Sequence, residues 1–141
     1  MAEMHVSVIT PDGTIFDHRA KAVNAQTTYG GITIIPGHMP IIVPLAIGEL
    51  RVTRITESDD SENYIAVSGG IMEVEADQIN IIANTAERSR DIDLDRAENA
   101  KKEAEASMIR ARDAKNKIEF NRARVALAKA VNRIGVSEKR L

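Results

Sequence analysis

The sequence contains no cysteine, which excludes disulfide scaffolds, cysteine nucleophiles and thiolate metal sites. Aromatic residues make up only 3% of its 141 residues, too few for the base-stacking platforms of single-stranded nucleic-acid binders, so nucleic acid is not an expected partner. No apolar run approaches the roughly 18 residues of a spanning helix, and residues 1–8 lack a secretory pattern. We therefore expect neither a Sec signal peptide nor direct insertion into a membrane.

The charges and the chain-breaking residues divide the sequence in two. Residues 1–87 hold 4 Lys and Arg against 12 Asp and Glu, whereas residues 88–141 hold 15 against 9. All four prolines lie in the first 44 residues and seven of the eight glycines in the first 70. The 43% of hydrophobic residues suffices for a core, so we predict one small globular domain over 1–87 and a basic appendage over 88–141.

The first part has the pattern of β-strands. Short alternating or β-branched runs occur at 5–9, 31–35, 50–55, 64–67 and 79–82. Turn chemistry separates them at 11–13, 30–31, 36–37, 58–61 and 69–70. This spacing predicts an antiparallel β-sandwich or flattened barrel. In its last strands Met72 and Val74 would face inward, which leaves Glu73 and Glu75 as solvated strand residues rather than a catalytic pair.

The second part has the pattern of helices. Small apolar residues recur every three or four positions from Ala97 to Ala114, and a second stripe runs from Phe120 to Ile134 before Gly135. Asp95 with Glu98 and Asn116 with Glu119 have the spacing of capping boxes. Residues 113–119 contain no glycine or proline, so both two helices and one bent helix are open. The fold class predicted is α+β, with a sandwich followed by a two-helix hairpin.

No constellation in the sequence supports catalysis. It has no Gly-x-x-x-x-Gly-Lys-Ser/Thr phosphate loop, and the paired glycines at 30–31 and 69–70 precede no helix. His5, His18 and His38 have neither metal-ligand spacing nor a nucleophile beside them. An enzyme is therefore the least favoured function, and we expect no metal and no required cofactor.

Three runs carry a resemblance to a known family. They are Pro36-Gly37-His38-Met39-Pro40-Ile41, Val67-Ser68-Gly69-Gly70-Ile71-Met72-Glu73-Val74 and Ile92-Asp93-Leu94-Asp95-Arg96-Ala97. In order and spacing they resemble the epsilon subunits of bacterial F-type ATP synthases over essentially the whole chain. The resemblance implies a non-catalytic rotor subunit for proton-driven ATP synthesis, held at the cytoplasmic face of the bacterial cell membrane as a peripheral protein. Residues 1–87 would be its rotor-binding domain and residues 88–141 its regulatory domain.

The resemblance also implies partners. Family sandwiches join the gamma subunit to the c-ring, and the helices restrain hydrolysis by the alpha/beta catalytic head, whose beta subunits offer an acidic surface. The partner-interface candidates are His38, Met39, Ile41 and Ile42 in a proline-stiffened loop over 36–44, and Arg122 and Arg124 on the basic second helix. A partly exposed loop histidine and a solvated helix face are the alternative interpretations.

A regulatory ATP site is the second implication of the resemblance. Family members that bind ATP use a carboxylate before the first helix, the Asp and Arg of Ile-Asp-x-x-Arg-Ala, and two basic residues on the second helix. The matching positions here are Glu87, Asp93, Arg96 with neighbouring Ala97, Lys129 and Arg133. Lys129 replaces an Arg of those members, which predicts weaker phosphate binding because Lys lacks the bidentate fork. Asp93 as a plain helix cap is the alternative.

A second function remains open at this point. A stand-alone ATP-sensing module would keep the nucleotide site but would need no rotor interface. An exposed apolar patch on the sandwich distinguishes the two hypotheses, because only the rotor subunit requires one.

Overall fold

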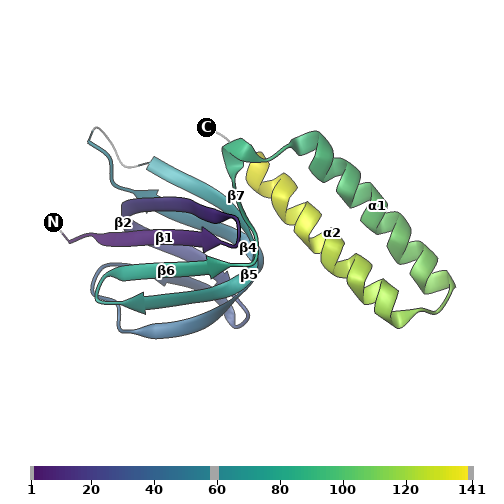
Figure 1. Cartoon of the computed structure of the whole chain (residues 1–141), viewed down its shortest axis with the longest axis horizontal. Coiled ribbons are helices and arrows are strands. Elements are labelled where there is room, and N and C mark those ends of the chain that lie inside the picture. Colours follow the sequence, from purple (N-terminus) through teal and green to yellow (C-terminus); the bar gives the residue numbers. More distant parts are fainter. Residues whose placement is uncertain (1, 58–60, 140–141) are drawn as a thin grey trace.

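The computed structural model describes residues 2–57 and 61–139 and places a β-barrel before a helical hairpin (Figure 1). The strands are β1 Met4–Thr10, β2 Gly13–Thr27, β3 Gly30–Ile34, β4 Ile41–Arg54, β5 Ser61–Glu75, β6 Gln78–Ala83 and β7 Ala86–Arg88. A 3-10 turn, η1 (Ser89–Asp91), leads to helices α1 (Leu94–Asp113) and α2 (Lys117–Ser137). The predicted fold class, a β-sandwich or flattened barrel followed by two helices, is confirmed.

Five of the strands close on themselves. Hydrogen bonds join these strands in the order β1, β6, β5, β4, β2, and β2 also pairs with β1, which closes the ring. In addition, β3 pairs with β2 and β7 pairs with β5. The pair β1–β6 is parallel, so the expectation of a wholly antiparallel sheet is wrong at this seam. These two strands are joined by no hairpin, and closure of the barrel sets their relative direction.

The core fills the inside of the barrel. Alternation along each strand buries one face, and the fully enclosed side chains include Val6, Phe16, Leu50, Ile65 and Ile79. Met72 and Val74 are buried and Glu73 and Glu75 are exposed, as predicted. All members of this core lie between Met4 and Ala86, so it requires no residue of the helices.

β2 and β4 are among the strands that differ from the sequence-based expectation. β2 is absent from the predicted strands because its covered positions include His18 and Ala20, which give a weak apolar signal, and because its buried face changes phase between Ala20 and Val23. β4 begins at Ile41, so the expected loop over 36–44 is shorter and Pro44 lies within a strand. Ile41 and Val43 pack against the core from this strand.

Gly69 and Gly70 lie inside β5, so the turn expected at this position is wrong. Their φ angles are +83° and +133°, and a Cβ on Gly70 would come within 2.2 Å of the Ile82 carbonyl oxygen. Glycine is thus required both for the backbone conformation and for the close approach of β6. At this irregularity β5 changes its neighbour: residues 65–67 pair with β7 and residues 70–75 pair with β6.

The helices form an antiparallel hairpin in which α1 leads away from the barrel and α2 returns to it (Figure 1). Asp93 caps α1 by accepting from the Arg96 N–H, and Asn116 caps α2 by accepting from the Glu119 N–H. The cap of α1 is therefore Asp93, which confirms the alternative interpretation of Asp93 as a helix cap, and not Asp95 of the suggested capping box. Lys115, at φ 55°, turns the chain between them. α2 continues through Gly135 to Ser137, past its predicted end.

Alanine determines how closely the helices pack. Ala97, Ala104 and Ala111 of α1 are buried at seven-residue spacing, as are Ala123 and Ala130 of α2. Small side chains bury little area each, so the hairpin depends on further contacts for its position. Those contacts lie at the end of α2.

Candidate functional site

Asn132 connects the returning helix to two adjacent strands. Its Nδ2 donates to the carbonyl oxygen of Gly48 at 3.0 Å and to that of Val67 at 3.4 Å. Gly48 and Val67 are register partners in β4 and β5, so one amide bridges the pair. A Cβ on Gly48 would come within 2.7 Å of the Gln26 side chain, so packing against β2 requires glycine at this position. Sequence reasoning missed Asn132, whose only signal is a polar residue within the apolar stripe of the second helix.

Arg133 and Glu87 form an ion pair beside this amide. Arg133 Nε lies 2.8 Å from Glu87 Oε1, and Nη2 donates to Oε2 at 3.2 Å. About a quarter of the Arg133 side chain and a third of the Glu87 side chain remain exposed (23% and 36%). Glu87 belongs to β7, so this pair ties the helix to the short strand that precedes η1.

Further contacts complete the attachment of α2. Val136 is buried with Ala66 and Ile92, and Tyr64 packs against them. Lys139 follows the helix and places Nζ 2.6 Å from Glu49 Oε1 and 5.1 Å from the centre of the Tyr64 ring. We call the contacts of Asn132, Arg133, Val136 and Lys139 with the sandwich the α2 anchor. None of its members except Arg133 was singled out from the sequence.

The structure brings some of the predicted nucleotide residues together. Glu87 and Arg133 are in contact, while Asp93 and Arg96 form the exposed first turn of α1, which lies near the end of α2 (Figure 1). Lys129 is exposed one turn before Arg133. Ala97 is fully buried, so in this conformation it supports the helix packing and offers no surface to a ligand.

The predicted interface loop is divided between exposed and packed residues. Met39 and Ile42 are 70% and 74% exposed, whereas Ile41 packs on the core. His38 is half-buried and its Nδ1 lies 2.7 Å from the Met39 carbonyl oxygen. The loop is pinned at Gly37, whose N–H donates to Asp77 Oδ1 at 2.8 Å. Met39 and Ile42 are therefore the loop residues that a partner could cover.

A row of apolar side chains crosses the outside of the barrel. Ile9, Ile82 and Ile71 are 41%, 53% and 46% exposed and lie in register on β1, β6 and β5. Exposed Pro44 continues the row on β4 as the partner of Ile71. We call these four residues the apolar row. Consecutive apolar residues such as Ile81-Ile82 indicate such a row in the sequence. Successive side chains of a strand point to opposite faces, so one residue of the pair must face outward.

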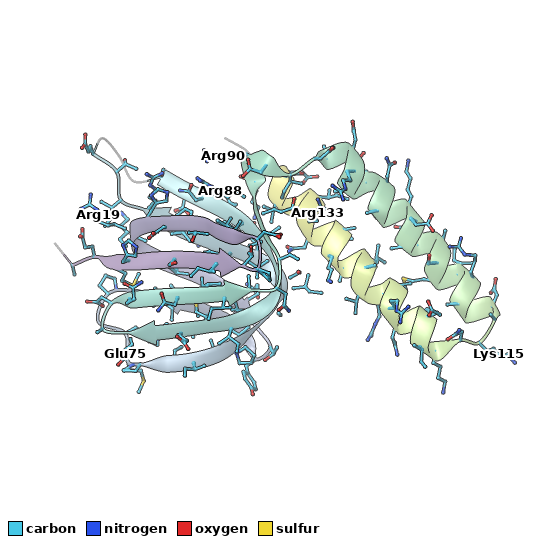
Figure 2. All side chains as sticks on the ribbon, viewed as in Figure 1. Arg19, Glu75, Arg88, Arg90, Lys115 and Arg133 are labelled. Carbon is cyan, nitrogen blue, oxygen red and sulfur yellow. The ribbon has the colours of Figure 1, made fainter. Side chains whose placement is uncertain are left out.

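The predicted cations of the second helix face solvent. Arg122 and Arg124 are both exposed, and Arg122 pairs with Glu119 at 3.3 Å. Figure 2 shows Lys115 at the tip of the hairpin, far from Arg133 at the barrel. In the described part of the chain, no helix is long and apolar enough to cross a membrane, and no three His, Asp or Glu side chains cluster as metal ligands would.

The structure is thus a small barrel with a helical hairpin attached through the α2 anchor. Two family models match it in succession: "ATP synthase, Delta/Epsilon chain, beta-sandwich domain" over residues 3–89 and "ATP synthase, Delta/Epsilon chain, long alpha-helix domain" over residues 90–138. The chain belongs to the delta/epsilon chain family of ATP synthase, whose members are non-catalytic stalk subunits.

Solved structures share the fold. A chain of the Euglena gracilis mitochondrial ATP synthase, in a structure of its OSCP, F1 and c-ring, superposes with a TM-score of 0.77 at 20% identity, over 94% of this chain and 79% of that one. A chain from the central stalk and c-ring of the Tetrahymena thermophila mitochondrial ATP synthase gives 0.53 at 19% identity, over 63% and 69%. At these identities the likeness concerns architecture.

Proposed function

We propose that the chain is the epsilon-type subunit of the central stalk in a bacterial F-type ATP synthase. Its sandwich joins the gamma subunit to the c-ring at the cytoplasmic face of the cell membrane, as part of a proton-translocating rotor. Its hairpin restrains ATP hydrolysis by the alpha/beta catalytic head. The family match over residues 3–138 supports the assignment, and the apolar row supports the coupling role.

The apolar row favours a rotor subunit over a stand-alone ATP sensor. Three half-exposed isoleucines in register on adjacent strands form a continuous apolar strip, the kind of surface that marks a protein–protein contact. Met39 and Ile42 add exposed apolar area on the neighbouring loop and strand. A protein partner that covers this face gains the hydrophobic free energy of their burial.

Restraint of the catalytic head requires that the hairpin leave the barrel, and its construction supports such a movement. The contacts of α2 with the sandwich lie in its last turns, at the α2 anchor. The barrel core is complete without the helices. Release of the anchor would therefore free a basic rod, with Arg122 and Arg124 exposed, to meet an acidic surface while the barrel stays on the rotor.

ATP is proposed as the regulatory ligand of the docked hairpin, bound among Glu87, Asp93, Arg96, Lys129 and Arg133. The contact of Glu87 with Arg133 and the exposed first turn of α1 support a site at this end of the hairpin. A polyphosphate would offset the repulsion between the cations of the two helices. Nucleotide would then favour the docked, non-inhibitory form.

The test is ATP hydrolysis by a complex reconstituted with altered chains. A chain truncated after Ser89 keeps β7 and the whole barrel core, so it should assemble normally and raise hydrolysis. The full-length variant Arg122→Glu/Arg124→Glu should raise it too, with an effect that shrinks as salt is added. Lys101→Glu/Lys102→Glu on α1 is the matched control. Unchanged hydrolysis with the truncated chain would disprove the restraint.

The coupling role has its own test. Ile71→Asn/Ile82→Asn should weaken co-purification with gamma and the c-ring, while Ile118→Asn, at a still more exposed isoleucine of α2 (72%), should not. Equal recovery of the complex with both variants would place the interface elsewhere. A melting curve of each isolated chain separates loss of binding from loss of folding.

A further inference from the structure

A small cleft lies where the sandwich meets the end of the returning helix. Its volume is about 140 Å³, and three segments line it: Glu62, Asn63 and Tyr64 of β5, Arg88 to Arg90 of β7 and η1, and Lys139 just after α2. Figure 2 shows Arg88 and Arg90 together at this end of the sandwich. Segments distant in the sequence thus bring three cations to one cleft.

Two of these cations lack a carboxylate partner among the described residues. Arg88 Nη2 donates to Asn63 Oδ1 at 3.1 Å, and its guanidinium carbon lies 5.4 Å from the centre of the Phe16 ring, so its fixed contacts are neutral. Neither Arg88 nor Arg90 forms an ion pair within the described part of the chain. Lys139 pairs with Glu49 of β4, a residue outside the lining of the cleft.

Cations outnumber carboxylates in the cleft: Arg88, Arg90 and Lys139 line it with one carboxylate, Glu62, which pairs with Arg51 at 3.6 Å. Burial lowers the pKa of the Arg88 guanidinium from its usual value, and the charges of Arg90 and Arg54 lower it further against the opposing effect of Asp91. The pKa of nearby His18 is lowered as well, by burial and then by Arg54 and Arg88. Positive groups held close together in a partly buried site favour the entry of an anion.

The volume of the cleft and the geometry of its Arg and Lys donors indicate which anion it can bind. At about 140 Å³ the cleft is smaller than the roughly 300–1,000 Å³ of pockets that enclose a whole small-molecule ligand. A tetrahedral phosphoryl group presents several oxygens, which suit the fork of an arginine and the point charge of a lysine. We propose that this cleft binds a phosphoryl group, supplied by inorganic phosphate or by the terminal phosphate of a free nucleotide.

The phosphoryl cleft is separate from the proposed nucleotide group. Successive residues of a strand point to opposite sides, and Glu87 and Arg88 are neighbours in β7. Glu87 accordingly contacts Arg133 of α2, whereas Arg88 contacts Asn63 of β5. Substitutions in one group can therefore be made without removing a ligand of the other.

Binding in the cleft would act on the hairpin. Arg88 and Arg90 belong to the sandwich and η1, whereas Lys139 follows α2, so an anion between them ties the end of the helix to the barrel. This consequence rests on the proposed function, since only a hairpin that leaves the barrel can be held back. Phosphate would then favour the docked hairpin by mass action, independently of ATP.

Titration of the full chain with sodium phosphate, followed by amide NMR shifts in a phosphate-free buffer, tests the site. The amides of residues 88–90 should shift saturably, whereas sodium chloride at equal ionic strength should not move them in this way. Arg90→Ala should weaken binding about tenfold, because it removes a charge-assisted contact from an exposed residue. Arg124→Ala, an exposed cation of α2, is the matched control.

Parallel titrations with ATP and with inorganic phosphate identify the source of the phosphoryl group. Saturable shifts with ATP in an Arg133→Ala chain, lost on adding Arg90→Ala, would assign the cleft to a nucleotide phosphate. Shifts with inorganic phosphate alone would assign it to the free ion. Shifts that chloride reproduces, or that survive unchanged in Arg90→Ala/Lys139→Ala, would overturn the proposal. Hydrolysis assays do not enter this test, so its failure is distinct from a failure of the proposed restraint.

Discussion

Asn132 Nδ2 lies 3.0 Å from the carbonyl oxygen of Gly48, although 84 residues separate them in the chain. Because the same amide also reaches Val67, Asn132→Ala leaves two strand carbonyls without this donor. We expect the docked hairpin to lose about 1–2 kcal/mol of stability. Hydrogen exchange should accelerate in the last two turns of α2 and stay unchanged in the barrel. Asn121→Ala, at an exposed position of the same helix, should show no acceleration.

The ion pair between Glu87 and Arg133 should show measurable coupling. A double-mutant cycle with Glu87→Gln and Arg133→Gln should give about 0.5–1 kcal/mol, since both side chains remain partly exposed and water screens them. Thermal unfolding of the helical signal measures it. The charge-swapped chain Glu87→Arg/Arg133→Glu should recover part of the loss. Strictly additive single effects would mean that the two groups do not interact in solution.

Nucleotide binding should follow the character of the basic residues on α2. Lys129→Arg should tighten ATP binding because a guanidinium meets phosphate with two parallel hydrogen bonds, and Arg133→Ala should abolish it. Calorimetric titration of the isolated chain measures both. Arg124→Ala, an exposed cation outside the proposed group, should bind ATP as the unaltered chain does. Absence of heat at several millimolar ATP in the unaltered chain would remove ATP from the proposal.

Ile41 and Ile42 should respond differently to the same change. Ile41→Asn puts an amide against the core and should cost roughly 1–3 kcal/mol of stability. Ile42→Asn alters an exposed side chain, should change stability by less than about 0.5 kcal/mol, and should weaken association with gamma or the c-ring. Asparagine avoids a like charge opposite Glu73, the register partner of Ile42. Urea melts and co-purification separate the two effects.

His18 should make the barrel less stable in acid. Its pKa is lowered in the folded chain, chiefly by burial and then by Arg54 and Arg88, so the unfolded chain binds the proton more tightly. Stability should therefore fall as the pH drops below about 6.5, the ordinary histidine pKa. In His18→Gln this part of the decline should vanish. Urea midpoints measured from pH 7.5 down to 5 test the sign, and an unchanged slope would contradict it.

The sequence predicts the helices of this chain better than its strands. Helix starts at Asp93 and Asn116 follow from local chemistry, because a side chain caps an amide only three residues away. Alternation does not identify β2, because its covered face includes His18 and Ala20 and its register, with a shift between Ala20 and Ala22, depends on distant β1 and β4. Gly69-Gly70 resembles a turn locally, and only the approach of Ile82 shows why glycine stands within a strand.

Only part of the candidate site was predictable from the sequence, because its contacts join residues that lie far apart in the chain. Glu87 and Arg133 were named through the family resemblance, and their contact joins residues 46 apart in the chain. The contacts of Asn132 and Lys139 could not be predicted locally, because their partners Gly48 and Glu49 lie 84 and 90 residues earlier in the chain. The apolar row likewise exists only once three strands are brought into register.

The position of Gly69 and Gly70 in β5 has a mechanical consequence. On one side of them Val67 accepts a hydrogen bond from the helix, and on the other side Ile71 belongs to the apolar row. Four residues of a single strand span at most about 13 Å. A load applied by a partner at Ile71 is thus transmitted along the covalent backbone to the carbonyl that holds α2. Under the proposed function, β5 would therefore both transmit force from the rotor and hold the hairpin that restrains ATP hydrolysis.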